Sequence, residues 1–237
     1  MCGTCGCKPH DFYPKSATSR QIKLDISLLN QNQQQATHNR ARFQQLRLPV
    51  VNLMSSPGSG KTRVLEATLP HLKSLKCAVI EGDLQTRRDA ERIKKTGTPA
   101  VQINTGKGCH LDARSIDTAL DQLDIASLQL LFIENVGNLV CPAAFDLGES
   151  LRVVVLAITE GEDKPLKYPD MFYDADVVLL NKMDLLPHLE VNLDDLYDNL
   201  KQIQPNAVVL PISAQTGEGI EGWIEWLTQA TRKFTSA

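Results

Sequence analysis

Short apolar runs rich in β-branched residues recur along most of the chain and alternate with amphipathic stretches of helical length. Within each run the apolar residues occupy successive rather than alternate positions, which is typical of strands buried on both faces of a parallel sheet. We therefore expect an α/β fold with a doubly wound, mostly parallel sheet and helices on both faces. The predicted strands are Val50 to Met54, Cys77 to Ile80, Ala100 to Ile103, Leu128 to Ile133, Val153 to Ile158, Val177 to Leu180 and Val208 to Ile212.

Helical patterns lie between these runs and ahead of the first one. We expect one or two helices over Gln21 to Leu46, and further helices over Arg63 to Leu75 and Leu111 to Leu123. In an open α/β sheet, ligands bind beyond the carboxyl ends of the strands, where the loops converge. The chemistry of the protein is therefore expected in the loops that follow the strands.

Composition excludes some classes of function. The 237 residues are 42% hydrophobic, enough for a sizeable core. With 25 basic and 28 acidic residues and a net charge of −3, the chain lacks the positive surface of a nucleic-acid-binding protein. No stretch approaches the roughly 18 apolar residues of a membrane span, and the N-terminus lacks the apolar core of a secretory signal. We expect a cytoplasmic protein without nucleic-acid or membrane partners.

The first predicted strand runs directly into SSPGSGKT at residues 55–62, which a helical pattern follows. This is a Walker A loop in its strand–loop–helix context, with Ser55 where the general pattern has its first glycine. Its glycines let backbone N–H groups face the phosphates, while Lys61 is placed to reach the β- and γ-phosphates and Thr62 to ligate Mg²⁺. A glycine-rich turn without a ligand is the alternative. The predicted phosphate-binding residues are Gly58, Ser59, Gly60, Lys61, Thr62 and Arg63, of which Lys61 and Thr62 are also predicted catalytic residues.

Two later loops indicate the base of the nucleotide. The strand Val177 to Leu180 ends in NKMD at residues 181–184, and the aspartate of an NKxD motif accepts hydrogen bonds from guanine N1–H and N2–H₂, a donor pair that adenine lacks. The last strand ends in SAQTGEG at residues 213–219, which resembles the guanine loop whose backbone N–H contacts O6. We expect GTP rather than ATP, with helix capping as the alternative role of the aspartate. The predicted guanine-site residues are Asn181, Lys182, Asp184, Ser213 and Ala214.

Acidic residues follow two further strands. Leu128 to Ile133 leads into ENVGN at residues 134–138, an acidic-x-x-Gly loop where GTPases usually carry Asp-x-x-Gly. We expect Glu134 to hold Mg²⁺ through a water and the Gly137 N–H to contact the γ-phosphate. The second strand continues into EGD at residues 81–83, which places Asp83 beside the same ion. Both acids belong to the predicted catalytic set, with a plain surface carboxylate as the alternative, and no catalytic base is identified.

The sequence also contains candidate metal ligands, the first of them at its N-terminus. Cys2, Cys5 and Cys7, the N-terminal cluster, have CxxCxC spacing, and the α-amine is close enough in sequence to be a fourth ligand. That amine has an ordinary pKa of about 8 and loses its proton at modest cost when a metal binds. Three thiolates and one amine suit Ni²⁺ in a square plane or Zn²⁺ in a tetrahedron. Disulfides are disfavoured in a reducing cytosol, and adventitious thiols are the remaining alternative.

A second candidate metal site comprises Cys109 and His110, which follow the third predicted strand. Adjacent residues seldom complete a site alone, so a dimer that pairs two Cys–His sets, or a third ligand such as Cys141, is required. Because Cys141 follows Glu134 closely, a ligand there would link the γ-phosphate loop to the metal. A buried cysteine and a helix-capping histidine are the alternative. Cys77 lies inside a predicted strand and is expected in the core.

The domain division follows from these motifs. The segment Lys8 to Arg20 contains two prolines and small polar residues, and it predicts a flexible tether. We therefore expect a flexible cysteine-rich metal-binding tail over residues 1–20. Residues 21–237 are expected to form a GTPase domain with an N-terminal helical extension.

Together the motifs resemble the HypB family of hydrogenase nickel incorporation GTPases, in the SIMIBI class of P-loop GTPases. The resemblance covers nearly the whole chain and rests on the N-terminal cluster, SSPGSGKT, EGD, GCH, ENVGNLVCP and NKMD. It implies GTP hydrolysis coupled to nickel delivery into the large-subunit precursor of nickel–iron hydrogenase, with the small metallochaperone HypA as partner. It also implies that the N-terminal cluster is a high-affinity nickel site, and that Cys109, His110 and nearby Cys141 form a metal site at a nucleotide-favoured homodimer interface.

The expected function is therefore a GTP-hydrolysing nickel metallochaperone that uses GTP, Mg²⁺ and Ni²⁺, with Zn²⁺ as an alternative ion at the Cys109–His110 site. A related nickel-delivery GTPase of the urease accessory type, UreG, is one alternative, against which the N-terminal cluster argues. A second is a nickel storage or sensing module in which GTP only sets the oligomeric state, and a third is an ATPase.

Overall fold

In a computed structural model that describes residues 19–83, 88–106 and 108–235, seven strands form a sheet in the order β3-β2-β4-β1-β5-β6-β7. Every neighbouring pair of these strands is parallel. The predicted α/β fold with a doubly wound parallel sheet is therefore confirmed. The strands are β1 Val50–Ser55, β2 Cys77–Asp83, β3 Ala100–Asn104, β4 Leu130–Glu134, β5 Leu151–Ala157, β6 Val177–Asn181 and β7 Val208–Pro211.

Helices occupy most of the connections between the strands. The α-helices are α1 Ser19–Gln45, α2 Lys61–Thr68, α3 Arg88–Lys95, α4 Ala113–Leu120, α5 Cys141–Ala144, α6 Lys164–Lys167, α7 Pro169–Tyr173, α8 Leu193–Ile203 and α9 Ile220–Thr235. Short 3-10 helices cover Leu69–Leu72, Ile125–Ser127, Ile158–Glu160 and Met183–His188.

Local chemistry explains where helices depart from the predicted bounds. α2 ends at Thr68 instead of continuing to Leu75, because Pro70 has no N–H to donate and the chain tightens there into a 3-10 helix. α4 begins only after Asp112, whose carboxylate accepts the Ser115 N–H at 2.7 Å and caps the helix. The N-terminal pattern forms one long helix, α1, rather than two.

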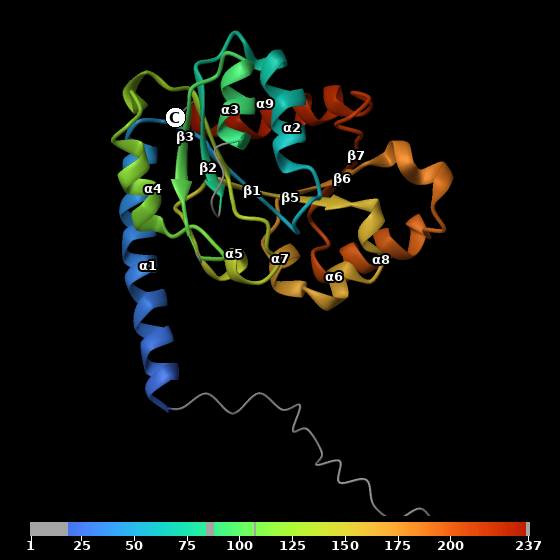
Figure 1. The fold of residues 1–237 in the computed structure, drawn as a ribbon, viewed down its shortest axis with the longest axis horizontal. Helices are drawn as coiled ribbons and strands as arrows, with labels where there is room; N and C mark the ends of the chain where they lie inside the picture. Colours follow the sequence, from blue (N-terminus) through green and yellow to red (C-terminus); the bar gives the residue numbers. More distant parts are fainter. Residues whose placement is uncertain (1–18, 84–87, 107, 236–237) are drawn as a thin grey trace, which may run out of the picture.

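The helices cover both faces of the sheet (Figure 1). On one face α2, α3 and α9 bury Val64, Ile93 and Trp223 against the strands. On the other face α1 and α4 cover β1, β2 and β4, while α7 and α8 cover β5 and β6. Trp223 is fully buried, and its Nε1 donates to Thr68 Oγ1 at 2.9 Å, which ties α9 to α2. Truncating a buried tryptophan of this kind costs about 3–5 kcal/mol of stability.

Helix α1 packs on the domain through its C-terminal half, while its N-terminal part projects away from the sheet (Figure 1). Asn39 is fully buried, and its Nδ2 donates to the carbonyl oxygens of Ala113 at 2.8 Å and Leu147 at 3.1 Å. Most of the predicted tail over residues 1–20, including the N-terminal cluster, lies outside the described residues. None of the described helices combines the length and apolarity needed to cross a membrane.

The parallel arrangement gathers the candidate motifs at one edge of the sheet. SSPGSGKT follows β1, EGD ends β2, ENVGN follows β4, and NKMD and SAQTGEG follow β6 and β7. The GCH segment at residues 108–110 follows β3 at the same edge. The sheet topology therefore brings together loops that are far apart in the sequence.

Candidate nucleotide and metal sites

The phosphate loop joins the end of β1 to the first residue of α2. Gly58 and Gly60 have φ angles of 75° and 102°, in the left-handed region that residues with a Cβ rarely adopt. Gly60 also lies so close to the Asn181 side chain that a Cβ on it would come within 2.6 Å of Asn181 Nδ2. Ser59, between the two glycines, is buried. The shape of the loop therefore requires both glycines, as the motif predicts.

The NKMD segment supports the phosphate loop directly. Asn181 Nδ2 donates to the Ser59 carbonyl oxygen at 2.8 Å, and Lys182 Nζ donates to the Gly58 carbonyl oxygen at 2.8 Å. The sequence predicts Asn181 and Lys182 as nucleotide-site residues, and the structure brings both beside the loop that is to hold the phosphates. Their contact with the loop backbone was not foreseen, because nothing in the local sequence pairs residues so far apart.

The two predicted guanine loops also contact each other. Ser213 Oγ donates to Asp184 Oδ1 at 2.6 Å, and the Ala214 N–H donates to Asn181 Oδ1 at 3.0 Å. The loops after β6 and β7 thus form one hydrogen-bonded unit. Asp184 and Ala214 lie within it, and their contacts with guanine stay predictions.

Lys61 has a partner inside the phosphate loop. Its side chain is buried, and Nζ donates to Ser55 Oγ at 2.7 Å, while Ser55 Oγ donates to the Ser56 carbonyl oxygen at 2.6 Å. Burial lowers the pKa of Lys61, and the carboxyl groups of Glu134 and Glu81 oppose that shift. The serine that replaces the first glycine of the general motif therefore holds the lysine, a role that the sequence pattern did not reveal.

Thr62 and Glu134 come from two predicted catalytic motifs and are hydrogen-bonded to each other. Thr62 Oγ1 donates to Glu134 Oε1 at 2.7 Å. Glu134 lies at the end of β4 and is buried, and this burial raises the pKa of its carboxyl group. The structure thus brings together the phosphate-loop hydroxyl and the acidic residue that were both predicted to hold Mg²⁺.

Glu81 is a candidate residue that the sequence analysis passed over. The register of β2 and β4 places it directly opposite Glu134, where it is 1% exposed. Burial, and next the carboxyl group of Glu134, raise the pKa of Glu81 to about 11. Glu81 and Asp83 point to the same face of β2, since side chains alternate along a strand. The alternation of side chains along β2 could therefore not show which of these two acids lies beside Glu134. The pairing of β2 with β4 shows that it is Glu81.

The buried carboxyl groups fit a hard divalent cation. Glu81 Oε1 and Glu134 Oε2 are both buried and have no hydrogen-bond partner among the described residues. A buried oxygen without a partner is costly, and oxygen atoms are the ligands that Mg²⁺ prefers. The donor set at this edge, which also includes Thr62, is therefore suited to Mg²⁺.

Asp83 and Arg63 are two further predicted site residues. Asp83 is the half-buried last residue of β2, and its carbonyl oxygen accepts the Thr105 N–H at 3.0 Å. Arg63 is on the outer side of α2 and forms an ion pair with Glu66 at 3.4 Å. The contacts expected of Asp83 with the metal and of Arg63 with the phosphates stay predictions.

Gly137 lies against the phosphate loop. A Cβ on Gly137 would lie 2.9 Å from Pro57 Cα and 3.5 Å from Lys61 Nζ. Only glycine allows the two backbones to approach this closely. The ENVGN loop therefore contacts the phosphate loop at the residue predicted to contact the γ-phosphate.

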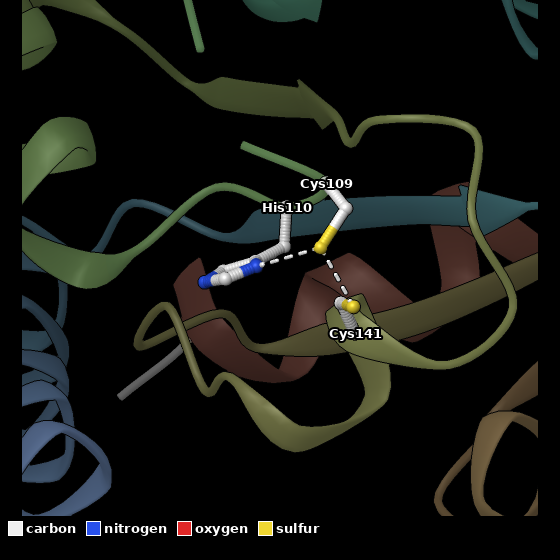
Figure 2. A group of neighbouring side chains, drawn as sticks. All are labelled: Cys109, His110 and Cys141. Carbon is white, nitrogen blue, oxygen red and sulfur yellow. Dashed lines mark hydrogen bonds between the residues drawn. The ribbon is translucent and has the colours of Figure 1, made fainter. Parts of the chain in front are cut away.

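Cys109, His110 and Cys141 lie together at the same edge (Figure 2). One ligand atom from each lies within 4.8 Å of the others. Cys109 Sγ is 2.7 Å from Cys141 Sγ and 3.6 Å from His110 Nδ1. The first two residues come from the loop after β3, whereas Cys141 is the first residue of α5. The fold thus assembles the three predicted ligands, which we call the triad, from two distant segments.

The surroundings of the triad suit metal binding. The His110 ring stacks on Phe145 with a centroid distance of 3.7 Å and an interplanar angle of 29°. Burial lowers the pKa of His110 and favours the neutral imidazole, which is the form that binds metals. The hydrogen bond between the Cys109 and Cys141 sulfur atoms raises the pKa of Cys141, with burial as a second cause. Two adjacent sulfur atoms and an imidazole are a donor set for Zn²⁺ or Ni²⁺.

The other cysteines divide clearly. Cys77 lies in β2, is 8% exposed, and its burial raises the pKa of the thiol to about 11. Its predicted place in the core is confirmed. Cys2, Cys5 and Cys7 lie outside the described residues, so the first predicted metal site stays a prediction.

Comparison with known proteins identifies relatives of this chain. Residues 49–211 match the family described as CobW/HypB/UreG, nucleotide-binding domain. The hydrogenase maturation factor HypB of Azotobacter vinelandii is 54% identical over 215 residues, which cover 90% of this chain and 71% of the relative.

Solved structures of HypB proteins share the fold as well as the sequence. HypB from Helicobacter pylori in complex with nickel is 40% identical, with a TM-score of 0.82 over 86% of this chain and 96% of the other. The hydrogenase maturation factor HypB from Archaeoglobus fulgidus is 37% identical, with a TM-score of 0.79 over 85% of this chain and 99% of the other. The chain therefore belongs to the HypB family of hydrogenase maturation factors, which its motifs resemble. This family lies within the wider CobW/HypB/UreG family.

Proposed function

We propose that this protein is a GTP-hydrolysing nickel metallochaperone, which couples nucleotide-dependent dimerisation and GTP hydrolysis to nickel insertion into the large-subunit precursor of hydrogenase. It works in the cytoplasm with a HypA-type metallochaperone. The observation that carries the proposal is the segment 134–141. Its first residue, Glu134, is hydrogen-bonded to the phosphate loop, and its last residue, Cys141, belongs to the triad.

GTP is the substrate of the phosphate-loop site. Lys61 exchanges its contact with Ser55 Oγ for the β- and γ-phosphates when the nucleotide binds. Asp184 accepts hydrogen bonds from guanine N1–H and N2–H₂, while the Ser213 hydroxyl orients its carboxylate. Thr62 and Glu134 hold Mg²⁺, which when bound neutralises charge on the phosphates.

The segment 134–141 responds to the γ-phosphate. The Gly137 N–H donates to the γ-phosphate before hydrolysis and loses this acceptor afterwards. Released from the phosphate, the segment shifts Cys141 relative to Cys109 and His110. The affinity of the triad for metal therefore differs between the GTP-bound and GDP-bound states.

Dimerisation completes the metal site. The triad supplies three ligands, and a tetrahedral or square-planar ion needs a fourth. A second copy of the chain, related by a two-fold axis, supplies further ligands from its own triad. The N-terminal cluster is a separate, high-affinity nickel site, and Zn²⁺ is the alternative ion at the triad.

GTP turnover tests this proposal. Phosphate release is measured for the full chain with and without a HypA-type protein and hydrogenase precursor, in the presence of excess ATP. The proposal predicts hydrolysis of GTP that ATP does not inhibit. Negligible hydrolysis with both partners present would instead favour a storage or sensing module in which GTP is only a switch, and competition by ATP would contradict the assigned base specificity.

A further inference from the structure

Two asparagine side chains in the segment 134–141 have no role in the account so far. Asn135 follows Glu134, which is hydrogen-bonded to Thr62, and Asn138 follows Gly137, which lies against the phosphate loop. The oxygen atom of each carboxamide accepts a hydrogen bond from one of the two chain segments that carry the triad.

Asn135 holds the segment that carries Cys109 and His110. It is 1% exposed, and its Oδ1 accepts the Leu111 N–H at 3.3 Å, directly after His110. The same oxygen accepts the Val136 N–H at 2.9 Å. The Asn135 backbone N–H donates to the Leu53 carbonyl oxygen at 3.0 Å, which anchors the residue on β1. Asn135 thus links β1, which leads into the phosphate loop, to the segment that carries Cys109 and His110. We call this segment the first arm of the triad.

Asn138 holds the segment that carries Cys141. Its Oδ1 accepts the Val140 N–H at 2.7 Å and the Cys141 N–H at 3.3 Å. These bonds fix the start of α5, where Cys141 is the first residue. Asn138 lies two residues before the N-cap residue Val140, so its oxygen closes a turn that leads into the helix, and alanine has no oxygen to replace it. Asn138 thus links Gly137 to the segment that carries Cys141, which we call the second arm of the triad.

We propose that Asn135 and Asn138 are the positioning residues of the metal site, which set the spacing of Cys109 and His110 from Cys141 and transmit the nucleotide state to that spacing. The inference rests on the proposed function, because it explains how the triad senses GTP. Neither residue is a ligand. Each acts through one hydrogen-bonded main-chain segment, so a variant that lacks the carboxamide oxygen still contains all three ligand side chains.

The geometry makes this assignment specific. A movement of Gly137 away from Pro57 is carried to Asn138, the next residue, and from its oxygen to the Cys141 N–H. Asn135 is buried and tied to β1, so the Cys109–His110 arm stays with the sheet. The two arms therefore respond differently to the same nucleotide, which changes the spacing of the sulfur atoms rather than moving the site as a whole.

The test uses the full chain with Cys2→Ser, Cys5→Ser and Cys7→Ser, so that Ni²⁺ binding reports on the triad. Ni²⁺ affinity is measured by competition with a chelator, and thiolate-to-nickel absorption identifies the ligands. Each measurement is made with GDP and with a non-hydrolysable GTP analogue. Asn138→Ala removes the acceptor, whereas Asn138→Ser keeps a neutral side-chain oxygen that can close the same turn.

Asn192→Ala is the matched control. Asn192 Oδ1 accepts the Asp194 N–H at 3.1 Å and the Asp195 N–H at 3.4 Å at the start of α8. Like Asn138, Asn192 accepts hydrogen bonds from the N–H groups two and three residues further on, so the control removes the same pair of bonds ahead of a helix that carries no triad residue. Unfolding temperature and affinity for the GTP analogue are recorded for every variant, so that loss of folding is separated from loss of metal.

We expect Asn138→Ala to weaken Ni²⁺ binding by about 10–100-fold, the usual effect of removing a group that orients a metal ligand. The ratio of Ni²⁺ affinities between the two nucleotide states should move towards one. Asn138→Ser should restore most of the Ni²⁺ affinity and most of its dependence on the nucleotide, and Asn192→Ala should change neither quantity. Asn135→Ala should also lower Ni²⁺ affinity, and where it fails to fold, Asn138 alone decides.

The possible results separate the inference from the proposed function. If Asn138→Ala binds Ni²⁺ as tightly as Asn192→Ala does, with an unchanged nucleotide ratio, the positioning role is wrong while the proposed function stands. If the parent protein itself binds Ni²⁺ equally in both nucleotide states, the proposed coupling is wrong. The comparison of Asn138→Ala with Asn138→Ser in one nucleotide state then still decides whether Asn138 positions the ligand.

Discussion

The phosphate-loop region and the triad lie at the same edge of the sheet, but the chain holds them in different ways. Around the phosphate loop, several buried polar side chains are hydrogen-bonded within or between motifs, as when Lys61 contacts Ser55 and Asn181 contacts the Ser59 carbonyl oxygen. In the triad, Cys109 and Cys141 contact each other, are half-buried, and belong to a loop and a four-residue helix.

This difference separates a preorganised site from an adjustable one. In the phosphate-loop region, Lys61, Thr62 and the Ser59 carbonyl oxygen are held by partners on β1, β4 and β6, so a nucleotide meets a loop that is already shaped. The triad depends on where the segment 134–141 lies, because that segment carries one ligand and neighbours the other two. A ligand that binds the first site is therefore in a position to alter the second, and by thermodynamic linkage metal at the triad alters nucleotide affinity by the same factor.

The largest expected effect separates GTP turnover from nickel binding at the N-terminal cluster. Lys61→Ala should lower the GTP hydrolysis rate by about 10²–10³-fold, since it removes the buried cation that stabilises charge on the phosphates. Nickel binding at the N-terminal cluster should be retained. Cys2→Ala should have the reverse effect, which hydrolysis and equilibrium nickel binding measure together. Loss of both activities in either variant would contradict the two-site account.

A second effect separates the triad from the other cysteines. Cys141→Ser should weaken Ni²⁺ binding at the triad by roughly 100-fold or more, because loss of a ligand exceeds the effect of losing a group that orients one. Affinity for the GTP analogue should be unchanged. Cys77→Ala is the matched control, since Cys77 lies in the core and should not affect metal. Equal Ni²⁺ affinities of the two variants, measured without the N-terminal cluster, would remove Cys141 from the ligand set.

A smaller effect tests the contact between the two regions. Gly137→Ala places a methyl group 2.9 Å from Pro57 Cα and should push the segment off the phosphate loop. Binding of the GTP analogue should weaken by about 1–3 kcal/mol, the usual cost of overpacking. GDP, which has no γ-phosphate, should bind as before. Isothermal titration with both nucleotides measures the difference, and an equal loss for both would mean that Gly137 does not sense the γ-phosphate.

The smallest effect concerns Ser55. Ser55→Gly restores the general phosphate-loop glycine and removes the oxygen that accepts a hydrogen bond from Lys61 in the described structure. Because Lys61 then gives up no partner when nucleotide binds, affinity for GTP should rise by about 0.5–1.5 kcal/mol, the net value of one hydrogen bond. Weaker GTP binding in this variant would show that Ser55 supports the bound state instead.

Much of the fold followed from local patterns. Strands buried on both faces gave continuous apolar runs, and the glycines of the phosphate loop have the positive φ angles that the motif requires. The end of α2 was missed because Pro70 lies inside an otherwise helical pattern, where it blocks the backbone ladder. The predicted helix from Leu111 begins too early, because Asp112 is the capping residue and α4 starts after it at Ala113.

Parts of the candidate sites could not be predicted from the sequence, because strand register determines which side chains lie next to each other. Glu81 and Asp83 share one face of β2, and only the pairing of Glu81 with Glu134 distinguishes them. The hydrogen bonds of Asn135 and Asn138 to the arms of the triad depend on the packing of loops from separate strands. Motif spacing identified the ligands and the phosphate contacts, whereas the groups that position them required the three-dimensional structure.

The most direct test of the account compares metal binding in two nucleotide states. Nickel affinity, nickel stoichiometry and mass in solution are measured for the full chain lacking the N-terminal cluster, with GDP and with a non-hydrolysable GTP analogue. The account predicts that the analogue favours a dimer whose triads bind Ni²⁺ with an affinity different from that of the GDP-bound protein. Equal affinity in both states would contradict it, because a ligand without differential affinity shifts no equilibrium.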